Sequence, residues 1–425
     1  MKIEQIYTGC LAQGAYYIES ENEVAIIDPL REVNQYIDKA KESNSIIKYI
    51  FETHFHADFV SGHITLSKKT GGKIVYGPTA ETNFDSLKAE DGEMFKIGNV
   101  TITAIHTPGH TLESTCYLLR DENNKEIAIF TGDTLFLGDV GRPDLAQANL
   151  KLTKEQLAGK LYDSLRNKIM NLPDDIIIYP AHGAGSACGK NMMKITSDTL
   201  ANQKKMNYAL DENLSKKEFI NAVLDGLGEP PKYFPANVKM NKEGYNDINN
   251  ILEKNRPLKV DEVEEIVNTS DTIILDVRTP DDFEKAHIPR SIFIGLDGSF
   301  APWVGELIAD VDQKIIFICD SGREEETITR LSRVGFDNTI GYLDGGITSW
   351  INSGKEIDSV TSINPEKTSQ INTEKNQIID VRKKSEYDLG KVKKAINICL
   401  STINNHHDQF LSEDHKFIHC QGGYR

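Results

Sequence analysis

The chain has 425 residues, which at roughly 150 residues per domain leaves room for about three domains and excludes a single small module. Its residues are 39% hydrophobic and 26% charged, as in globular proteins, and no stretch reaches the ~18 consecutive apolar residues of a membrane-spanning helix. The net charge of -16 argues against a nucleic acid or an anionic membrane as a partner, because both would repel the chain.

The cellular setting is inferred from the first residues and from the cysteines. Met1 to Gln5 contain no basic stretch followed by an apolar core, so we expect no export signal and a cytoplasmic protein. The six cysteines show no CxxC spacing, which favours reduced thiols over a disulfide framework or a zinc ribbon. The sequence does not decide between a monomer and a homo-oligomer.

The first half of the chain alternates short β-like runs with helical stretches, which predicts packed strands with helices outside. The expected strands are Val24–Ile27, Ile46–Phe51, Ile74–Tyr76, Val100–Ile105, Ile127–Phe130 and Ile176–Tyr179, and the expected helices are Val33–Glu42 and Lys154–Met170. A polar helical pattern follows from Thr196 to Leu227. Prolines 230, 231 and 235 then break the pattern, which predicts a domain boundary near residue 245.

The second half contains an internal repeat. Leu275-Asp276-Val277-Arg278 matches Ile379-Asp380-Val381-Arg382, and farther on Ile316-Phe317-Ile318-Cys319 matches Phe417-Ile418-His419-Cys420. In both copies a strand-like run leads directly into a cysteine and a loop that contains glycine. We therefore expect two copies of one α/β module with a seam between Asp358 and Thr373. The second copy has only five residues after its cysteine, where the first has about 39, so we expect the second copy to be incomplete.

Histidines and aspartates follow several expected strands of the first half. His54, His56 and Asp58 form an HxHxD motif, in which histidines two residues apart on extended backbone can face one point. His110 follows a Pro-Gly turn, Asp133 stands in Thr-Gly-Asp, and His182 stands in Pro-Ala-His-Gly. Because each lies just after an apolar strand, we expect these side chains to converge at one edge of a sheet as a metal site.

This order and spacing resemble the metallo-β-lactamase fold over roughly residues 1–235. Binuclear members of that fold, including glyoxalase II, have a second-site histidine where this chain has Phe59. The remaining Asp58 and His182 are too few to hold a second cation, so a mononuclear site is expected and two-metal hydrolysis is disfavoured. Two histidines with one carboxylate suit Fe(II) with open positions for O2 and substrate.

Within the fold, the chain is most similar to the persulfide dioxygenases, which share the loop from Gly132 to Asp144. The resemblance implies one Fe(II) per chain, held by His54, His110 and Asp133, with His56 as an adjacent candidate ligand. It also implies that Arg142, His182 and Asp58 serve substrate binding. Arg142 would pair with an anionic part of the carrier thiol, and an ion pair with Asp139 or Asp144 is the structural alternative. Cys188 is a candidate catalytic thiol that could relay sulfur, and a small packed cysteine is its alternative.

The repeated modules resemble rhodaneses. The last six residues run from Cys420 to Arg425 with Gly422 and Gly423 between them, so the loop can direct backbone N–H groups at the sulfur. The resemblance implies that Cys420 is the sulfur-carrying nucleophile and Arg425 its anion clamp. In the first copy, Cys319 is followed by Asp320 and Glu324, and negative charge disfavours a thiolate. We therefore expect the middle module to be inactive.

The whole chain resembles the fused persulfide dioxygenase–rhodaneses of bacterial sulfide detoxification. We expect an α/β multidomain protein: a metallo-β-lactamase αββα sandwich with its connector at 1–245, a rhodanese-like module at 246–358, and an incomplete second rhodanese at 359–425. The implied partners are O2, sulfite and a low-molecular-weight thiol persulfide of the coenzyme A, bacillithiol or glutathione type, with thiosulfate as the product of sulfur transfer. The alternatives are a glyoxalase II-like zinc thioester hydrolase and a sulfane-sulfur carrier or sensor.

Overall fold

The computed structural model describes residues 1–145, 152–364, 366, 376–410 and 415–423. The chain divides into two compact units. One comprises Met1–Ile251 together with Thr329–Asp337, and the other comprises Leu252–Ile328 and Asn338–Arg425.

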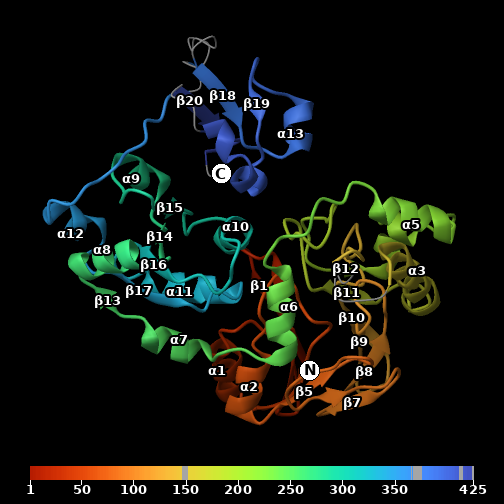
Figure 1. Cartoon of the computed structure of the whole chain (residues 1–425). Helices are drawn as coiled ribbons and strands as arrows, with labels where there is room; N and C mark the ends of the chain where they lie inside the picture. Colours follow the sequence, from red (N-terminus) through yellow and green to blue (C-terminus); the bar gives the residue numbers. More distant parts are fainter. Residues whose placement is uncertain (146–151, 365, 367–375, 411–414, 424–425) are drawn as a thin grey trace. The chain divides into compact units, whose positions relative to one another are not determined.

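The first unit contains two six-stranded sheets, whose strands run from red to yellow-green in Figure 1. Neighbouring strands follow chain order in both sheets, from β1 to β6 in the first and from β7 to β12 in the second. The first sheet consists of β1 (Lys2–Thr8), β2 (Gln13–Ser20), β3 (Glu23–Ile27), β4 (Ile46–Phe51), β5 (Lys73–Tyr76) and β6 (Leu87–Lys88). The second consists of β7 (Met94–Ile97), β8 (Val100–His106), β9 (Thr115–Arg120), β10 (Glu126–Gly132), β11 (Ile177–Pro180) and β12 (Asp198–Thr199).

The two sheets pack face to face because both faces of their central strands are apolar. Alternate residues of a strand point to opposite faces. In β9, Tyr117 and Leu119 belong to the core between the sheets, whereas Cys116 and Leu118 belong to the core beneath the helices. In β2, Ile18 lies in the core between the sheets and Tyr17 in the core under the helices of the first sheet. The resulting layers are helix, sheet, sheet and helix, which confirms the predicted αββα sandwich.

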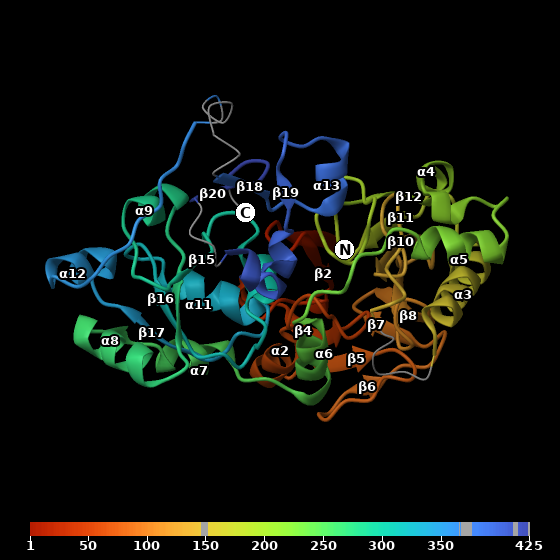
Figure 2. The same ribbon diagram turned by 45° about the horizontal axis from the view of Figure 1, so that its top comes forward.

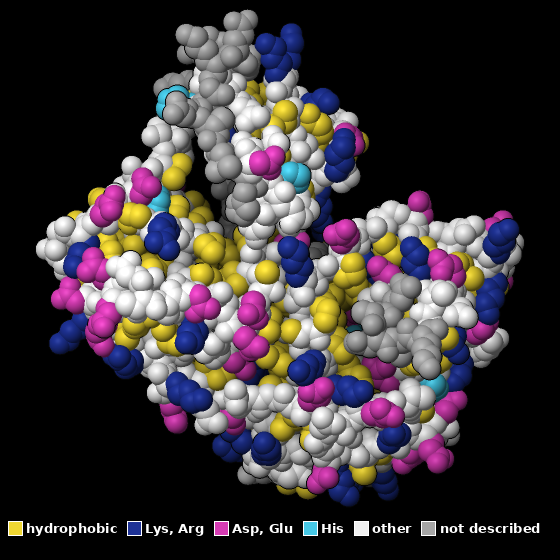
Figure 3. All heavy atoms as spheres, in the orientation of Figure 1, with side chains coloured by type: hydrophobic (Ala, Val, Ile, Leu, Met, Phe, Trp, Pro, Cys, Tyr) yellow, Lys and Arg dark blue, Asp and Glu magenta, His cyan; other side chains and the backbone are white. Residues whose placement is uncertain are grey.

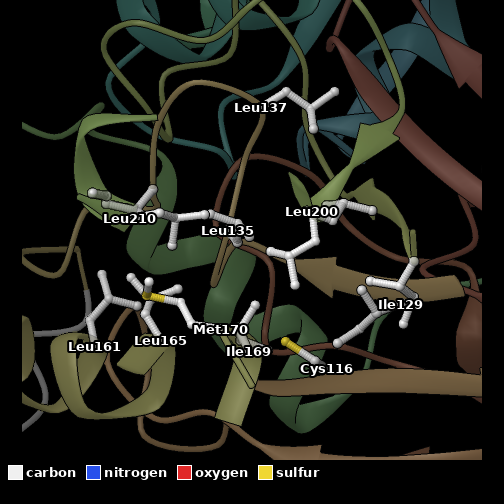
Figure 4. Close-up of a cluster of buried hydrophobic side chains, with 14 of the residues drawn as sticks. Cys116, Ile129, Leu135, Leu137, Leu161, Leu165, Ile169, Met170, Leu200 and Leu210 are labelled. Atoms are coloured by element: carbon white, nitrogen blue, oxygen red, sulfur yellow. The ribbon is translucent and has the colours of Figure 1, made fainter. Parts of the chain in front are cut away.

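Helices cover the outer face of each sheet. On the first sheet, α1 (Asn34–Glu42) and α2 (His63–Thr70) bury apolar side chains against the strands. The second sheet is covered by α3 (Lys154–Ser164), the π-helix η2 (Leu165–Ile169), α4 (Leu200–Met206), the 3-10 helix η3 (Tyr208–Leu210) and α5 (Lys216–Leu224). Figure 4 shows this core, in which Leu161 and Leu165 lie near Leu135 while Cys116 and Ile129 come from the strands. The predicted helix from 154 to 170 is thus α-helical first and π-helical over its last turn. Two helices, α6 (Phe234–Glu243) and α7 (Ile248–Lys254), follow.

The second unit begins with a parallel sheet of five strands in the order β13-β17-β16-β14-β15. The strands are β13 (Pro257–Leu258), β14 (Ile273–Asp276), β15 (Ile292–Phe293), β16 (Ile315–Ile318) and β17 (Thr339–Leu343). The helices along this part of the chain are α8 (Val260–Thr269), α9 (Pro280–Lys285), α10 (Phe300–Leu307), α11 (Glu324–Arg333) and α12 (Gly346–Asn352). Strand β16 is buried along its whole length, as parallel strands between helices are.

The last part of the chain repeats the centre of this sheet, and Figure 2 shows its three strands close together. The strands β18 (Asn376–Asp380), β19 (Ile396–Asn397) and β20 (His415–His419) are parallel in the order β19-β18-β20, like β15-β14-β16 before them. The helices between them are α13 (Lys384–Leu389) and the 3-10 helices η5 (Leu400–Asn405) and η6 (His407–Phe410). Arg278 binds Asp276 at 2.6 Å, and Arg382 binds Asp380 at 2.7 Å in the same way. The shared strand order and ion pair confirm the repeat.

Candidate metal centre

The predicted ligands lie in loops that follow strands of the first unit. His54 follows β4, His110 follows β8, Asp133 follows β10, and His182 follows β11. Strands β10 and β11 are parallel neighbours, so Asp133 and His182 leave the second sheet side by side. Each of the four side chains is at most 2% exposed. The structure therefore brings polar side chains from four separate loops into one buried place.

Three of these residues form one group. One ligand atom each from His54, His110 and Asp133 lies within 4.8 Å of the others. The Oδ2 atom of Asp133 is 3.5 Å from Nε2 of His110 and 3.8 Å from Nε2 of His54. This oxygen is buried and has no hydrogen-bond partner in the described part of the chain. Two imidazole nitrogens and one carboxylate oxygen are thus directed at a common point.

Hydrogen bonds on the far side of each ring fix which nitrogen is free to bind a cation. Nδ1 of His110 lies 2.8 Å from the backbone oxygen of Arg142, which can only accept, so Nδ1 carries the proton. Nδ1 of His54 lies 3.0 Å from the hydroxyl of Thr53, which itself donates to Asp28. The His54 ring must therefore donate to that hydroxyl. Both Nε2 lone pairs then face Asp133, an arrangement that suits a bound metal ion.

His182 connects Asp133 with Asp58. Nδ1 of His182 lies 2.7 Å from Oδ1 of Asp133, and its Nε2 lies 2.8 Å from Oδ2 of Asp58. Burial alone would lower the pKa of His182, but the two carboxylates outweigh burial and raise it well above the usual value. Burial alone would raise the pKa of Asp133, yet His182 and His54 lower it. Asp133 is therefore a carboxylate with one oxygen held by His182, and its other oxygen accepts no hydrogen bond from the described residues.

His56 does not join the group of His54, His110 and Asp133. The loop after β4 is not extended strand, and His56 forms a second group with Asp58 and His182. Its Nε2 lies 3.1 Å from Oδ1 of Asp28, and its ring packs 4.3 Å from the ring of Phe59. Phe59 is fully buried and lies 6.3 Å from the ring of His182. An apolar ring thus stands beside this second group of side chains.

Two further residues, Asp28 and Gly141, support the site and were not expected from the sequence. Asp28 accepts hydrogen bonds from the amide and the hydroxyl of Thr53 and so fixes the partner of His54. It follows the apolar strand β3, as Asp133 follows β10, and that shared pattern could have revealed it. At Gly141, a Cβ atom would meet the backbone oxygen of Asp133 at 2.1 Å and Nδ1 of His110 at 2.9 Å. Only glycine lets the loop approach these two residues so closely.

Arg142 pairs with a neighbouring carboxylate. Its guanidinium donates to Asp144 at 3.1 and 2.7 Å and to the backbone oxygen of Gly228 at 2.6 Å. The side chain thus forms the ion pair with Asp144 that is the alternative to binding a substrate anion. Its backbone oxygen, rather than its side chain, contacts the group of ligands.

Cys188 lies beside the candidate ligands. Its sulfur is within 4.8 Å of ligand atoms of Asp133 and His182, and the residue is 2% exposed. Burial, followed by the charges of Asp58 and Asp133, raises the pKa of the Cys188 thiol well above its usual value. A neutral thiol therefore faces the carboxylate of Asp133.

The two rhodanese-like loops differ in their electrostatics. In the first, burial and then Glu324 and Asp320 raise the pKa of Cys319 to about 12. The only arginine of that loop, Arg323, is bound to Asp297 and Glu326. In these surroundings Cys319 is a thiol at neutral pH.

In the second loop, the amide of Gly423 donates to the sulfur of Cys420 at 3.0 Å. A backbone donor aimed at sulfur favours the thiolate. Arg425, the predicted anion clamp, lies outside the described residues.

The charges on the surface and the lengths of the helices concern two classes of partner, nucleic acids and membranes. On the face shown in Figure 3, acidic and basic side chains are interspersed rather than gathered by sign. Among the residues that the structure describes, none of the helices combines the length and the apolar character needed to cross a bilayer.

Family models and known proteins match both halves of the chain. The model described as "Metallo-beta-lactamase superfamily" matches residues 8–182, and the model described as "Rhodanese-like domain" matches residues 259–353 and 365–425. A probable hydroxyacylglutathione hydrolase of Schizosaccharomyces pombe is 35% identical over 168 residues, 39% of this chain and 60% of that protein. The chain thus spans about 60% of the length of this relative.

A mitochondrial persulfide dioxygenase of Bos taurus is 30% identical over 210 residues, 49% of this chain and 73% of that protein. The crystal structure of a metallo-beta-lactamase from Staphylococcus aureus subsp. aureus COL matches with a TM-score of 0.71 and 30% identity, over 80% of this chain and 98% of that one. The match to the Staphylococcus aureus structure covers enough of the chain to include residues of both the αββα sandwich and the α/β modules. The chain therefore belongs to the metallo-beta-lactamase superfamily and carries rhodanese-like domains in its C-terminal half.

Proposed function

We propose that the chain is a mononuclear non-haem iron persulfide dioxygenase coupled to sulfur transfer. One Fe(II) would be held by His54, His110 and Asp133, whose three ligand atoms already converge. The observation that carries the proposal is Phe59, a fully buried apolar ring beside the second group of side chains. An aromatic ring supplies no ligand for a second cation, so a single metal with open positions is favoured.

Iron at this point would supply a binding place for O2 and for the terminal sulfur of a thiol persulfide, together with the redox chemistry. The reaction consumes a persulfide, O2 and water, and it releases the thiol, sulfite and two protons. The protein itself would hold the proton of each imidazole on Nδ1, through Thr53 for His54 and through the backbone of Arg142 for His110, so that both Nε2 atoms can bind the metal. His182 would keep Asp133 ionised. The carrier thiol is proposed to be of the glutathione, coenzyme A or bacillithiol type.

The second rhodanese loop would use the sulfite. A persulfide on Cys420 would transfer its outer sulfur to sulfite, which breaks the S–S bond, returns the Cys420 thiolate and forms thiosulfate. We expect a Cys420→Ser protein to lose this transfer. A Cys319→Ser protein is the matched control and should retain it, because the surroundings of Cys319 keep it protonated. Transfer at the parent rate by the Cys420→Ser protein would reject this step.

A zinc thioester hydrolase is the second candidate. Its support is the group of His56, Asp58 and His182, which offers three ligand atoms within 4.8 Å of one another, and the similarity to a hydroxyacylglutathione hydrolase. Against it, Nε2 of His56 faces the buried carboxylate of Asp28, and His182 is already engaged by Asp133 and Asp58. The two candidates differ in the number of metal ions they need.

The substitution Phe59→His tests the proposal. The parent should hold one iron per chain and oxidise a persulfide, whereas Phe59→His should gain a second metal ion and thioester hydrolysis. Phe55→His is the matched control, because Phe55 packs on Tyr76 at 4.8 Å instead of on the second group. It should leave the metal content unchanged. Two metal ions in the parent, with thioester hydrolysis and no reaction with persulfide, would reject the dioxygenase.

A further inference from the structure

The loop from His56 to Ser61 carries Asp58 and is held from outside by a segment distant in the sequence. Residues Thr329–Asp337 belong to the first unit, although the rhodanese-like match spans 259–353. We propose that Thr329–Asp337 is a positioning element of the metal centre, which fixes this loop and through it the ligand Asp133. The inference rests on the metal site proposed above, but not on the identity of the metal or of the reaction.

A backbone hydrogen bond joins the segment to the loop. The amide of Val60 donates to the backbone oxygen of Arg333 at 2.8 Å. Val60 is fully buried, so without this acceptor its amide would lose its hydrogen bond away from water. The position of the Arg333 backbone therefore sets the position of Val60, two residues after Asp58.

Arg31 locks the segment in place. Its guanidinium donates to Asp337 at 2.6 and 3.0 Å and to the backbone oxygen of Ser332 at 2.8 Å. Arg31 is 1% exposed, and its guanidinium carbon lies over the ring of Tyr245, 4.9 Å from the ring centre. Removing one partner of a buried ion pair is costly because the charge left behind stays buried. Asp337 thus ties the segment to the first unit through a buried arginine, alongside the ion pair of Arg333 with Glu32.

A helix completes the support of the loop. Asn241 of α6 donates to the backbone oxygens of His56 and Phe59, and it accepts from the amide of Ser61. The same helix meets the segment, since a Cβ atom on Gly335 would lie 2.6 Å from Oδ1 of Asn237. The loop is therefore held by α6 and by the segment together.

The path from the segment to the metal centre consists of short contacts. Val60 fixes the loop that carries Asp58, Asp58 lies 2.8 Å from His182, and His182 lies 2.7 Å from Asp133. A displaced Asp58 would release one nitrogen of His182 and let the carboxylate of Asp133 turn. Substitution of residues that hydrogen-bond to metal ligands commonly lowers the metal affinity about 10–100-fold.

The test compares iron affinity in full-length variants by competition with a chelator. Asp337→Ala should lower the affinity about tenfold, and Asp337→Asn, which keeps the shape but not the charge, should lower it less. Hydrogen exchange at the Val60 amide should be slow in the parent and faster in both variants. The matched control is Asp297→Ala, because Asp297 also receives two hydrogen bonds from an arginine, Arg323, in the second unit. It should leave the iron affinity unchanged.

Each outcome decides the inference. If Asp337→Ala folds and binds iron as the parent does, the segment has no positioning role, even where the variant melts at a lower temperature. If Asp337→Ala does not fold, unchanged affinity and unchanged Val60 exchange in Asp337→Asn overturn the inference in the same way. A parent protein that binds no metal through His54, His110 and Asp133 would instead overturn the proposed function itself.

Discussion

The Nδ1 atom of His182 lies 2.7 Å from the Oδ1 atom of Asp133. This contact occupies one oxygen of the carboxylate and leaves Oδ2 facing the Nε2 atoms of His54 and His110. His182 is in turn 2.8 Å from Asp58, so a carboxylate stands on each side of its ring. The arrangement makes His182 a support of the metal ligand Asp133.

Replacing His182 by glutamine should weaken metal binding. The substitution removes one of the two ring contacts, so Asp133 loses its fixed orientation. We expect a 10–100-fold loss of iron affinity, measured by chelator competition. His106→Gln is the matched control, because His106 contacts the backbone of Leu112 and belongs to none of the ligand groups that the described residues form. Equal affinities of the two variants would contradict the role of His182.

Gly141→Ala should disturb the same centre from the opposite side. The added Cβ would stand 2.1 Å from the backbone oxygen of Asp133 and 2.9 Å from Nδ1 of His110. We expect a loss of bound iron together with about 1–3 kcal/mol of unfolding free energy, measured by metal analysis and denaturant titration. Gly9→Ala is the control, since a Cβ there would meet no atom within 4 Å. Full iron content in Gly141→Ala would show that the loop can move aside.

The layers of the fold could be predicted because the strands alternate or are apolar throughout. The runs Val24–Ile27 and Ile127–Phe130 lie within the observed β3 and β10. Strands β1 and β2 were not expected, because polar side chains interrupt their pattern and only pairing across the sheet identifies them. The π-helical turn at Leu165–Ile169 also has no signature in the helical periodicity.

The site was predictable as a set of residues but not as two groups. The positions of His54, His110 and Asp133 after strands indicated convergence, and the structure brings them together. The side to which His56 turns depends on the buried carboxylate of Asp28, which lies far from it in the sequence. The contact that orients His110 is made by the backbone oxygen of Arg142, so the types of the side chains do not predict it.

Cys319 should react slowly with alkylating reagents because only the thiolate attacks. Burial, Glu324 and Asp320 raise its pKa to about 12, so the rate at pH 8 is low and rises as the pH approaches 12. The double substitution Asp320→Asn with Glu324→Gln removes two of these causes. It should speed alkylation of Cys319 several-fold, as followed by mass spectrometry of the labelled peptide. Glu325→Gln, which removes the next carboxylate along α11, should have a smaller effect. Equal rates in all three proteins would show that burial alone controls this thiol.

His63 should make the fold sensitive to acid. Burial, and then the charge of His56, lower the pKa of His63 from its usual 6.5 to about 3. Between these two pH values the unfolded chain binds a proton that the folded chain does not, so stability falls as the pH drops from about 6.5 to 3. The contribution reaches about 1.4 kcal/mol per pH unit.

Denaturant titrations over this pH range test the effect of His63. His63→Phe keeps an aromatic ring among Tyr76, Phe84 and Tyr245 and should make the loss of stability shallower. The same substitution at the exposed His415 should leave the slope unchanged. A slope in His63→Phe as steep as that of the parent would assign the acid sensitivity to other groups.

Oxygen uptake by the iron-loaded protein on addition of a thiol persulfide tests the central claim most directly. If the claim holds, one O2 is consumed for each sulfite formed, and the uptake is lost when His110→Ala removes an iron ligand. A protein that takes up no O2 with glutathione, coenzyme A or bacillithiol persulfide, and that instead hydrolyses a glutathione thioester with two bound zinc ions, would contradict it.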